Sequence, residues 1–577
     1  MKTECKIGVY VCNCGTNIAK MVDCDAVSAY ASTQPGVVVC KSYKYMCSNP
    51  GQEMIVKDVQ ELKLDRVVVA ACSPRMHEPT FRAAIEKAGI NPYFLEMANI
   101  REQCSWVHEN KEQATDKAKA LTCAAIRRVA YHEPFNRQSV PMHPATLVIG
   151  GGIAGLTAAL ELAGADQPVY LVEKEDQLGG NVARIDQTAP YLDSARDMLT
   201  ERITHVTQHP KIAVLLKSEV ESISGYVGNF KAVVKTAGGA EQQVDVGSII
   251  VCTGFQPFDA SKTSRYGYGI LPNVITSYEL EKMLREGRVQ TRDGRAPKYV
   301  TIVNCVGSRS KETHAYCSRV CCMTALKYGH EIRSAVPGVK ITNLYTDMNA
   351  FGKGCEDFYR RSAEAETVFM MYDKWNRGKV RAAGKRDGCE LLMVVKEMLS
   401  GEEVEIPSDL VVLMVGMEAR SDSGKVARLV NISRDRDGWF IESHPKLDPV
   451  ATTTDGVFIA GACQSPKDIP ESVAQARATA ARILAKICHG EIMVEPVYAE
   501  IDENLCSGCR MCNELCPYSA IEYDPVKKRS HIINVMCKAC GTCVAACPSG
   551  AIKARHFTDQ QIFEQIEGVL EWASSHV

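Results

Sequence analysis

Two cysteine runs near the C-terminus carry the most distinctive chemistry in the chain. Each has the form CxxCxxCxxxCP, and the runs end at Cys516-Pro517 and Cys547-Pro548. Runs of this form hold pairs of [4Fe–4S] clusters, in which the fourth cysteine of each run ligates the other cluster. We therefore expect one cluster on Cys506, Cys509, Cys512 and Cys547, and a second on Cys537, Cys540, Cys543 and Cys516. A zinc ribbon is the alternative, and two complete runs argue against it.

A glycine-rich turn predicts a dinucleotide-binding site. The sequence GGGIAG, Gly150–Gly155, follows an apolar strand expected at 145–149 and precedes a helix expected at 156–162. A second strand, 169–172, ends at Glu173. Glycines in such a turn let the backbone approach a pyrophosphate at the helix N-terminus, and the acidic residue about 20 positions later binds the ribose hydroxyls.

Two later segments indicate FAD rather than NAD. Residues 248–257 predict a strand that ends in a Thr-Gly-x-x-Pro turn, and residues 454–462 are similar to the late motif of two-dinucleotide flavoproteins. Ala462 stands where an aspartate is usual, which puts one polar contact to the flavin in question. The candidate cofactor-binding residues are Gly150, Gly152, Ile153, Ala154, Gly155, Glu173, Lys174, Gly180, Asn181, Thr253, Gly254, Gly461, Ala462, Lys467 and Ile469.

The second lobe of this domain lacks the glycine fingerprint that would bind NAD(P)H. A strand is expected at 298–304, but cysteines follow it where the phosphate-binding loop would be. Four of them, Cys305, Cys317, Cys321 and Cys322, fall within 18 residues, a density that suits a third [4Fe–4S] cluster. A redox-active dithiol with structural cysteines is the alternative. If the cluster is present, electrons reach or leave the flavin one at a time.

The N-terminal zone places cysteines after predicted strands at 7–11, 37–39, 66–71 and 92–97. A parallel sheet gathers the carboxyl ends of its strands at one edge, where open α/β sheets bind ligands. We expect Cys14 (or Cys12), Cys47, Cys72 and Cys104 to ligate a fourth cluster there, near Arg75, His77 and Arg101; reduced core thiols are the alternative. Cys5, Cys24, Cys40 and Cys123 are expected to be ordinary packing residues.

The composition fits this distribution of chemistry. The chain has 577 residues, 26 of them cysteine, and a net charge of −2, so no global attraction to nucleic acid or to an anionic membrane is expected. Its first residues show no signal peptide, and the apolar stretch 145–165 contains glycines and Glu161, so we predict a cytoplasmic protein without membrane insertion. The predicted divisions are residues 1–135, 144–495, 497–555 and a C-terminal amphipathic helix in 556–577, which covers the core or docks a partner.

Taken together, these motifs resemble the A subunit of heterodisulfide reductases. The resemblance rests on VCNCGTNIA, RVVVAACSPRMHEPTFR, FLEMANIREQCSWVH, GGGIAGLTAALELA, NCVGSRSKETHAYCSRVCC, FGKGCEDFYRR, GACQSPKDIPESVAQA and the paired cysteine runs. It implies an α/β fold with an N-terminal parallel α/β cluster domain, a thioredoxin-reductase-like two-lobed FAD domain and a C-terminal bacterial-type ferredoxin domain. It implies FAD and about four [4Fe–4S] clusters as cofactors.

The match has two gaps. Longer members carry an inserted ferredoxin module in the FAD domain, whereas residues 218–230 of this chain run on without cysteine. The stretch 193–198 also lacks the cysteines expected in longer members. The chain is therefore similar to a short form of the family, with different redox partners.

The resemblance implies flavin-based electron bifurcation between a two-electron donor, a low-potential ferredoxin and a disulfide acceptor reduced on another subunit. It implies B- and C-like subunits as partners, an electron-input subunit that is hydrogenase-linked or flavin-oxidoreductase-like, and a homodimer within the complex. We predict that Lys467 lies beside the isoalloxazine ring as the catalytic residue; a solvated loop lysine is the alternative. The rival functions are an NAD(P)H-dependent oxidoreductase similar to the small subunit of glutamate synthase, and a non-bifurcating relay in a quinone- or sulfur-metabolism complex.

Overall fold

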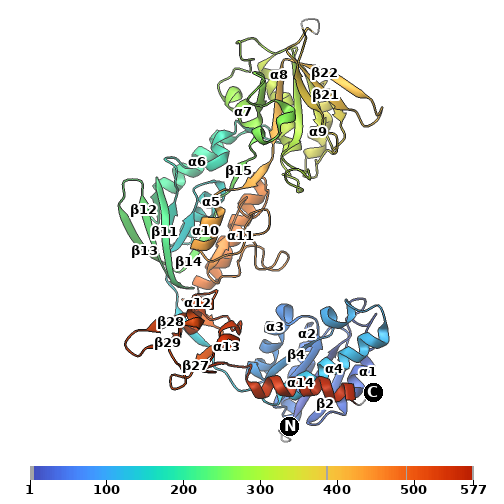
Figure 1. The fold of residues 1–577 in the computed structure, drawn as a ribbon, viewed down its shortest axis with the longest axis vertical. Coiled ribbons are helices and arrows are strands. Elements are labelled where there is room, and N and C mark those ends of the chain that lie inside the picture. Colours follow the sequence, from blue (N-terminus) through green and yellow to red (C-terminus); the bar gives the residue numbers. More distant parts are fainter. Residues whose placement is uncertain (1–4, 385–387, 489, 575–577) are drawn as a thin grey trace. The chain divides into compact units, whose positions relative to one another are not determined.

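The computed structural model describes residues 5–384, 388–488 and 490–574, and these fall into two compact units. One unit combines Met1–Ser139 with Met493–Val577, and the other is Val140–Ile492 (Figure 1). The second unit coincides closely with the predicted flavin domain. The first unit brings together the N-terminal zone, the ferredoxin-like module and the C-terminal helix, for which separate domains were predicted.

The N-terminal zone is a parallel α/β sandwich. Its strands are β1 (Ile7–Cys12), β2 (Val37–Tyr43), β3 (Arg66–Ala71) and β4 (Leu95–Asn99), arranged β2-β1-β3-β4 with every pairing parallel. Its helices are α1 (Cys24–Ser32), α2 (Asn49–Leu62), α3 (Pro74–Lys87) and α4 (Lys111–Val129). Helices α1 and α4 contact each other, as do α2 and α3, so the sheet has a helical layer on each face.

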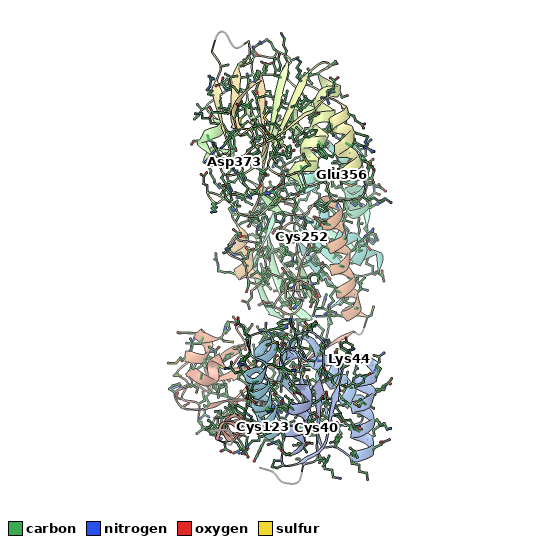
Figure 2. All side chains as sticks on the ribbon, turned by 90° about the vertical axis from the view of Figure 1, so that its right-hand side faces the viewer. Cys40, Lys44, Cys123, Cys252, Glu356 and Asp373 are labelled. Carbon is green, nitrogen blue, oxygen red and sulfur yellow. The ribbon has the colours of Figure 1, made fainter. Side chains whose placement is uncertain are left out.

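The predicted packing cysteines of this zone take part in its core. Cys24 and Cys123 are buried, and Cys40 lies beside Ser28 with 3.2 Å between sulfur and oxygen. Figure 2 labels Cys40 and Cys123 among the N-terminal elements. The expected strand at 92–97 begins later than predicted, because Asn91 caps a 3-10 turn at Pro92–Phe94.

The C-terminal part of this unit contains the two cysteine runs and a helix. Two short antiparallel pairs, β27 (Ala499–Ile501) with β30 (Ile552–Ala554) and β28 (Ile521–Asp524) with β29 (Arg529–Ile532), accompany helices α12 (Met511–Leu515) and α13 (Thr542–Ala546). Helix α14 (Asp559–Ser574) then packs against α4. The approach is close at Gly568, where an added Cβ would lie 2.7 Å from the Ala124 Cα.

Helix α14 does not bury the face that its sequence pattern suggested. Its contact side carries Gln561 and Glu564, which are 1% and 5% exposed, and the Arg127 guanidinium of α4 pairs with Glu564. Ile562 and Ile566 are 41% and 49% exposed. The helix therefore covers the N-terminal core at α4, which is one of its two expected roles, but it does so through polar side chains and Gly568, and Ile562 and Ile566 stay exposed.

The first lobe of the second unit is a five-stranded parallel sheet in the order β10-β7-β6-β14-β25. The strands are β6 (Thr146–Ile149), β7 (Val169–Val172), β10 (Ile212–Leu215), β14 (Ser248–Val251) and β25 (Val457–Ile459). Helices α5 (Ile153–Gly164), α6 (Ala195–Gln208) and α11 (Ile469–Ile487) cover one face. The antiparallel strands β11 (Ser218–Tyr226), β12 (Asn229–Thr236) and β13 (Glu241–Val246) pack on the other.

The second lobe repeats this plan. Its parallel sheet, in the order β16-β23-β17-β18-β19, contains β16 (Val274–Thr276), β17 (Tyr299–Val306), β18 (Lys340–Tyr345), β19 (Val368–Met371) and β23 (Leu410–Val415). Its helices are α7 (Ser277–Arg285), α8 (Cys321–Ala335) and α9 (Cys355–Glu364), and the antiparallel layer is β20 (Lys379–Ala382), β21 (Leu391–Lys396) and β22 (Glu403–Ser408). The strands β15 (Phe255–Pro257) and β24 (Met417–Ala419) pair antiparallel between the lobes.

None of the helices in the described part of the chain is both long enough and apolar enough to cross a membrane. The stretch 145–165, which could be mistaken for a span, is divided between β6, the glycine turn and α5.

Candidate functional site

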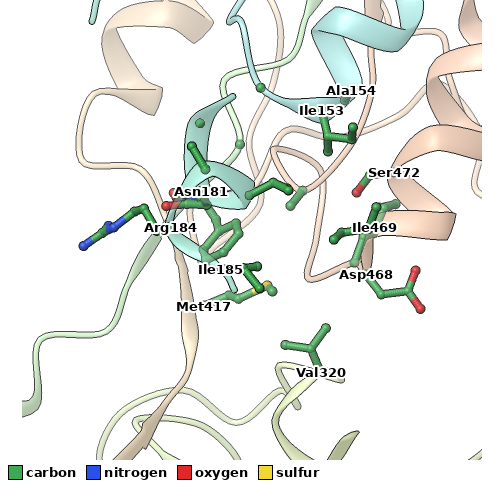
Figure 3. Close-up of a pocket in the computed structure, with 18 of the residues that line it drawn as sticks. Ile153, Ala154, Asn181, Arg184, Ile185, Val320, Met417, Asp468, Ile469 and Ser472 are labelled. Carbon is green, nitrogen blue, oxygen red and sulfur yellow. Dashed lines mark hydrogen bonds between the residues drawn. The ribbon is translucent and has the colours of Figure 1, made fainter. Parts of the chain in front are cut away.

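A cavity of about 1300 Å³ lies in the second unit and is lined by both of its lobes. In Figure 3, Ile153 and Ala154 of α5 and Ile469 of α11 lie on one side of it, and Val320, directly before α8, lies on another. Its volume is larger than the ~300–1000 Å³ of an ordinary ligand pocket, so it has room for a dinucleotide-sized molecule.

The glycine turn forms one wall by close backbone packing. An added Cβ on Gly155 would lie 1.9 Å from the Gly150 carbonyl oxygen, so helix α5 can approach β6 this closely only without a side chain there. Gly150 itself has φ of 111°, which favours glycine. The N-cap of α5, Gly152, supplies no side-chain cap, so the N–H groups of the first turn are available to an anion such as a pyrophosphate.

The acidic residue at the end of β7 stands where a ribose is expected. Glu173 is buried, and its carboxylate accepts hydrogen bonds from the N–H groups of Gly151 at 2.7 Å and Glu175 at 2.9 Å. Its neighbour Lys174 forms an ion pair with Asp422 at 3.1 Å. The glycine turn and the acidic residue of a dinucleotide fingerprint therefore both lie at this wall.

The late motif lies next to the start of α5, where an added Cβ on Gly461 would be 2.8 Å from the Ala154 Cβ. Helix α11 begins with a capping box, in which the Asp468 carboxylate accepts from the Glu471 N–H at 2.7 Å. Ala462 lines the cavity with its methyl group, so no aspartate contact is made there. Most of the predicted cofactor-binding residues line the cavity: Gly150, Gly152, Ile153, Ala154, Glu173, Lys174, Gly180, Asn181, Thr253, Gly254, Ala462, Lys467 and Ile469. Gly155 and Gly461 are not among its lining residues, and they act through backbone packing.

Lys467 also lines the cavity rather than extending into solvent. Its ammonium donates to Gln464 Oε1 and to Ser465 Oγ, each at 2.8 Å. Burial lowers the pKa of Lys467, and the positive charge of Arg319 acts in the same direction. Cys463, Glu471 and Glu442 act in the opposite direction, so the pKa of this lysine responds to negative charge placed beside it.

The four cysteines of the second lobe converge at the carboxyl end of β17. Cys305, Cys321 and Cys322 are buried, and Cys317 is half-buried. Burial raises the pKa of Cys321 well above its ordinary value, and the thiols of Cys305, Cys322 and Cys317 raise it further, which shows that the four sulfurs are electrostatic neighbours. Buried thiols of this kind become thiolates when metal ions supply the compensating charge.

Cationic and amide groups surround these four thiols. The Arg309 guanidinium lowers the pKa of the Cys305 thiol after burial has raised it, and Arg377 donates to the Cys305 carbonyl oxygen at 2.6 Å. Asn349 and the Arg319 N–H point at the Cys317 sulfur, at 3.6 and 3.3 Å. Such donors stabilise the charge of sulfur ligands around an iron–sulfur cluster.

This thiol group shares the cavity with the flavin motif. Cys321, at the start of α8, lines the same cavity as the glycine turn and the late motif. Because β17 pairs with β18 on one side and β23 on the other, the group lies where the strand order of the second sheet reverses. An open α/β sheet binds its ligand at that point, which NAD(P)H would otherwise occupy.

In the N-terminal zone, the structure brings together Cys12, Cys14, Cys47 and Cys72. Burial raises the pKa of Cys12 to about 12, and the other three thiols add to the shift. Arg101 faces the group, and its guanidinium lowers the pKa of Cys72, which burial raises. Among the described residues, Cys104 stands outside this group.

The position of Cys104 has a local cause. A π-helical turn, Arg101–Ser105, follows β4, and it places the Cys104 sulfur 4.0 Å from the Asn99 carbonyl oxygen. Burial raises the pKa of Cys104 to about 11, and its charged neighbour is Lys117 of α4. The ligand role of Cys104 thus stays a prediction, and both Cys12 and Cys14, between which the sequence left the choice open, lie in this group.

In the ferredoxin-like module, the last cysteine of the first run lies beside the second run. Burial raises the pKa of Cys543 to about 11, and the thiols of Cys537, Cys516 and Cys540 add to the shift. The Cys516 sulfur therefore lies with the second run. Cys512 has Cys509 and Cys506 as its neighbouring thiols, and the Ala520 N–H donates to the Cys516 sulfur at 3.3 Å.

Some residues of the cavity were not singled out from the sequence. Cys355, at the N-terminus of α9, lines the cavity, and its motif FGKGCEDFYRR gave the only available signal. Lys327 and Glu281 form a buried ion pair at 2.5 Å on the cavity wall. Glu331, one turn after Lys327, has its pKa raised by burial to about 8. No sequence pattern predicts the ion pair of Lys327 with Glu281, because α7 and α8 come into contact only in the folded lobe.

The thiol groups predict the iron content of the protein. We expect about sixteen irons and one FAD per chain after anaerobic purification, and Cys322→Ala should lose about four irons, because each cubane holds four. The measurement is iron, sulfide and flavin analysis. Cys123→Ala, which removes a buried thiol outside the groups, is the control and should keep all its iron. About eight irons in the parent protein would leave only the ferredoxin-like module as a cluster site.

The N-terminal group predicts which cysteine is dispensable there. Cys12→Ser should lower the iron content by about four per chain, whereas Cys104→Ser should leave it unchanged, because Cys14, Cys47 and Cys72 act on the Cys12 thiol and Lys117 is the charged neighbour of Cys104. Iron analysis of the two variants, prepared side by side, provides the measurement. The reverse pattern would return Cys104 to the ligand set.

Comparisons with known proteins agree with this organisation. The pyridine nucleotide-disulphide oxidoreductase family matches residues 144–480, and the 4Fe-4S dicluster domain family matches residues 505–554. The fold class predicted from the sequence is thereby confirmed, as are FAD and [4Fe–4S] clusters as its cofactors.

Curated relatives match along nearly the full chain. One of the iron-sulfur A subunits of the CoB--CoM heterodisulfide reductase of Methanopyrus kandleri is 41% identical over 653 aligned positions, which cover 98% of each chain. The A subunit of the H(2):CoB-CoM heterodisulfide,ferredoxin reductase of Methanothermobacter thermautotrophicus is 39% identical, with 98% of each chain covered. A protein of Archaeoglobus profundus, named as like the A subunit of heterodisulfide reductase, is 35% identical over 90% of this chain and 91% of its own.

These alignments extend over more positions than the 577 residues of this chain, so the relatives contain segments that it lacks. Residues 218–230 lie in the β11–β12 pair, with Tyr226 opposite Asn229 at its turn. This is the segment in which the inserted ferredoxin module of longer members was expected and no cysteine was found. The cysteine groups, the flavin cavity and the relatives lead to one identification: the chain is an oxidoreductase that belongs to the family of heterodisulfide reductase A subunits.

Proposed function

We propose that this chain bifurcates electrons within a heterodisulfide-reductase-like complex. As a member of its family it is an electron-transfer subunit with flavin and iron–sulfur cofactors. The bound FAD would supply the exchange between two-electron and one-electron chemistry. The residues of this chain would hold the flavin and direct single electrons to two acceptors, a low-potential ferredoxin and a disulfide reduced on another subunit.

The observation that carries this proposal is the shared cavity of the two lobes. The glycine turn at Gly150 and the thiol of Cys321 line one space, so the flavin and a cluster would be neighbours without a nucleotide between them. Lys467 lies on the wall of the same space. Groups that exchange single electrons need this proximity, whereas hydride transfer from NAD(P)H needs a nucleotide loop, which the sequence of the second lobe does not contain.

The proposed partners follow from the chemistry that the chain does not itself carry. Its relatives include the A subunits of proteins named as H(2):CoB-CoM heterodisulfide,ferredoxin reductase and H(2)/formate:CoB-CoM heterodisulfide,ferredoxin reductase. By analogy the partners are B- and C-like subunits, a ferredoxin and an electron-input subunit, with a homodimer of this chain within the complex. The exposed apolar stripe of α14, which includes Ile562 and Ile566, gives such a partner a surface.

Bifurcation requires that the two electron routes depend on each other. In the reconstituted complex, ferredoxin reduction should stop when the high-potential disulfide acceptor is withheld and resume when it is added, because one electron can go uphill only while the other goes downhill. The measurement is anaerobic absorbance of ferredoxin with the donor in excess. Ferredoxin reduction that proceeds without the acceptor would favour the simple relay, and bleaching of the isolated chain by NADH or NADPH would favour the nucleotide-dependent oxidoreductase.

The environment of Lys467 predicts its effect on the flavin. Lys467→Gln should lower the flavin potential by an amount of the order of 60 mV per electron, because it removes a charge that stabilises the reduced, more negative cofactor. Burial lowers the pKa of Lys467. The charge is thus present below this lowered pKa and lost as the pH rises through it, so the potentials of parent and variant should converge at high pH.

Anaerobic redox titration of the flavin absorbance from about pH 6 to 10 gives these potentials. Lys446→Gln serves as the matched control, because Lys446 is exposed and does not line the cavity. Equal potentials for the parent and Lys467→Gln at every pH would assign Lys467 to the loop structure alone.

A further inference from the structure

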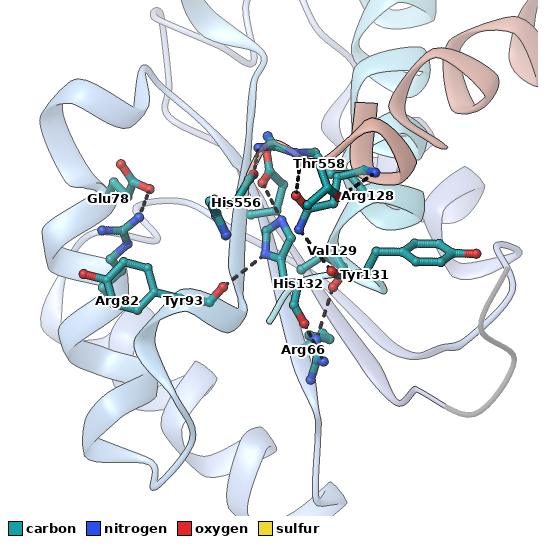
Figure 4. A network of polar contacts seen from close by, with 12 residues as sticks. Arg66, Glu78, Arg82, Tyr93, Arg128, Val129, Tyr131, His132, His556 and Thr558 are labelled. Atoms are coloured by element: carbon teal, nitrogen blue, oxygen red, sulfur yellow. Dashed lines mark hydrogen bonds and ion pairs between the residues drawn. The ribbon is translucent and has the colours of Figure 1, made fainter. Parts of the chain in front are cut away.

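Three metal-ligating side chains meet in the first unit, outside every cysteine group. Glu96 comes from β4, His132 follows the end of α4, and His556 follows β30. One ligand atom from each lies within 4.8 Å of the other two. His132 is 2% exposed and His556 7%, so both rings are held in the interior (Figure 4).

The hydrogen bonds of His132 determine which of its nitrogens is free. Its Nδ1 lies 3.1 Å from the Tyr93 carbonyl oxygen, and because a carbonyl can only accept, Nδ1 carries the proton of this bond. In the neutral ring, Nε2 then presents a lone pair. It lies 3.2 Å from Glu96 Oε2, so two acceptor atoms face each other. A cation between them would turn this repulsion into two bonds.

Each of the two histidine rings has one nitrogen without a partner among the described residues. Nε2 of His132 and Nδ1 of His556 are both buried and have no hydrogen-bond partner within the described part of the chain. Two buried nitrogens without partners, at one place, need a ligand.

The neighbouring arginines are already committed to other partners. Arg128 donates to Glu96 Oε1 at 2.8 Å and to the His556 carbonyl oxygen at 3.0 Å, which leaves Oε2 facing His132. Arg82 is paired with Glu78 at 2.7 Å and with Glu495 at 3.2 Å. The Arg128 bond fixes the orientation of the carboxylate, as outer-shell partners of metal ligands do.

We propose that Glu96, His132 and His556 bind a zinc ion. Zinc bonds of ~2.0–2.1 Å to nitrogen and oxygen give a tetrahedron with ligand–ligand edges of ~3.3 Å, which the 3.2 Å between His132 Nε2 and Glu96 Oε2 already matches. Two histidines and one glutamate form a common zinc ligand set, and water would complete the coordination. The ion would fasten the segment between the ferredoxin-like module and α14 to the N-terminal sheet, independently of the electron-transfer function.

Zinc analysis of the full-length holoprotein tests this assignment. The protein is purified anaerobically, incubated with zinc chloride, and freed of loose metal by gel filtration in EDTA. We expect about one zinc per chain in the parent and at least a tenfold loss in Glu96→Gln and in His556→Asn. Asparagine suits position 556 because His556 adopts φ of 65°, a left-handed conformation that asparagine tolerates. His531→Ala, which alters an exposed histidine of the β28–β29 hairpin, should keep its zinc.

Zinc-edge X-ray absorption separates this site from cysteines that have lost iron. The expected spectrum has nitrogen and oxygen neighbours at ~2.0–2.1 Å and no sulfur at ~2.3 Å. A variant whose iron content equals that of the parent has folded. If neither variant reaches that iron content, the zinc-edge spectrum of the parent protein decides whether zinc binds at this site. Zinc near background in the parent, zinc bound through sulfur, or zinc retained in both folded variants would each overturn the proposal.

Discussion

In each lobe of the flavin-binding unit, the order of the parallel strands reverses at one central strand. An open α/β sheet binds its ligand in the crevice at the carboxyl end of such a strand, so the two reversals determine where the unit can hold its cofactors. In the first lobe the order reverses at β6, which is followed by the glycine turn, and in the second it reverses at β17, which is followed by Cys305. Both edges open on one cavity. The same backbone plan thus offers two equivalent ligand positions, and the side chains that follow each strand decide whether a dinucleotide or an iron–sulfur cluster suits it.

Burial of the cysteine groups changes the energy needed to ionise their thiols. The thiols of Cys12, Cys321 and Cys543 each lie beside other cysteines, and desolvation raises the pKa of all three. These thiols are neutral when no metal is bound, and metal ions would provide the positive charge that allows them to ionise together. Nearby guanidinium groups, such as Arg309 and Arg101, add to that charge without occupying the metal position.

Sequence patterns were sufficient where the chemistry is local. The observed β3 and β7 coincide with the predicted strands, and residues 305–322 converge because a strand and the following helix position them within one loop connection. Sequence patterns were insufficient where contacts between distant segments determine the position of a residue. The π-helical turn that contains Cys104 has no sequence signature, and the packing of α14 on α4 at Gly568 left Ile562 exposed. Likewise, Glu96, His132 and His556 are distant in sequence and meet only in the fold.

The central claim is that iron–sulfur chemistry occupies the position in the second lobe where a pyridine nucleotide would bind. Anomalous diffraction at the iron edge, from crystals of the anaerobically prepared protein, tests it most directly. The account predicts a strong iron peak enclosed by Cys305, Cys317, Cys321 and Cys322, beside the flavin density. Four metal-free thiols in that map, with a nucleotide bound at the end of β17 when the crystals are soaked in NADH, would contradict it.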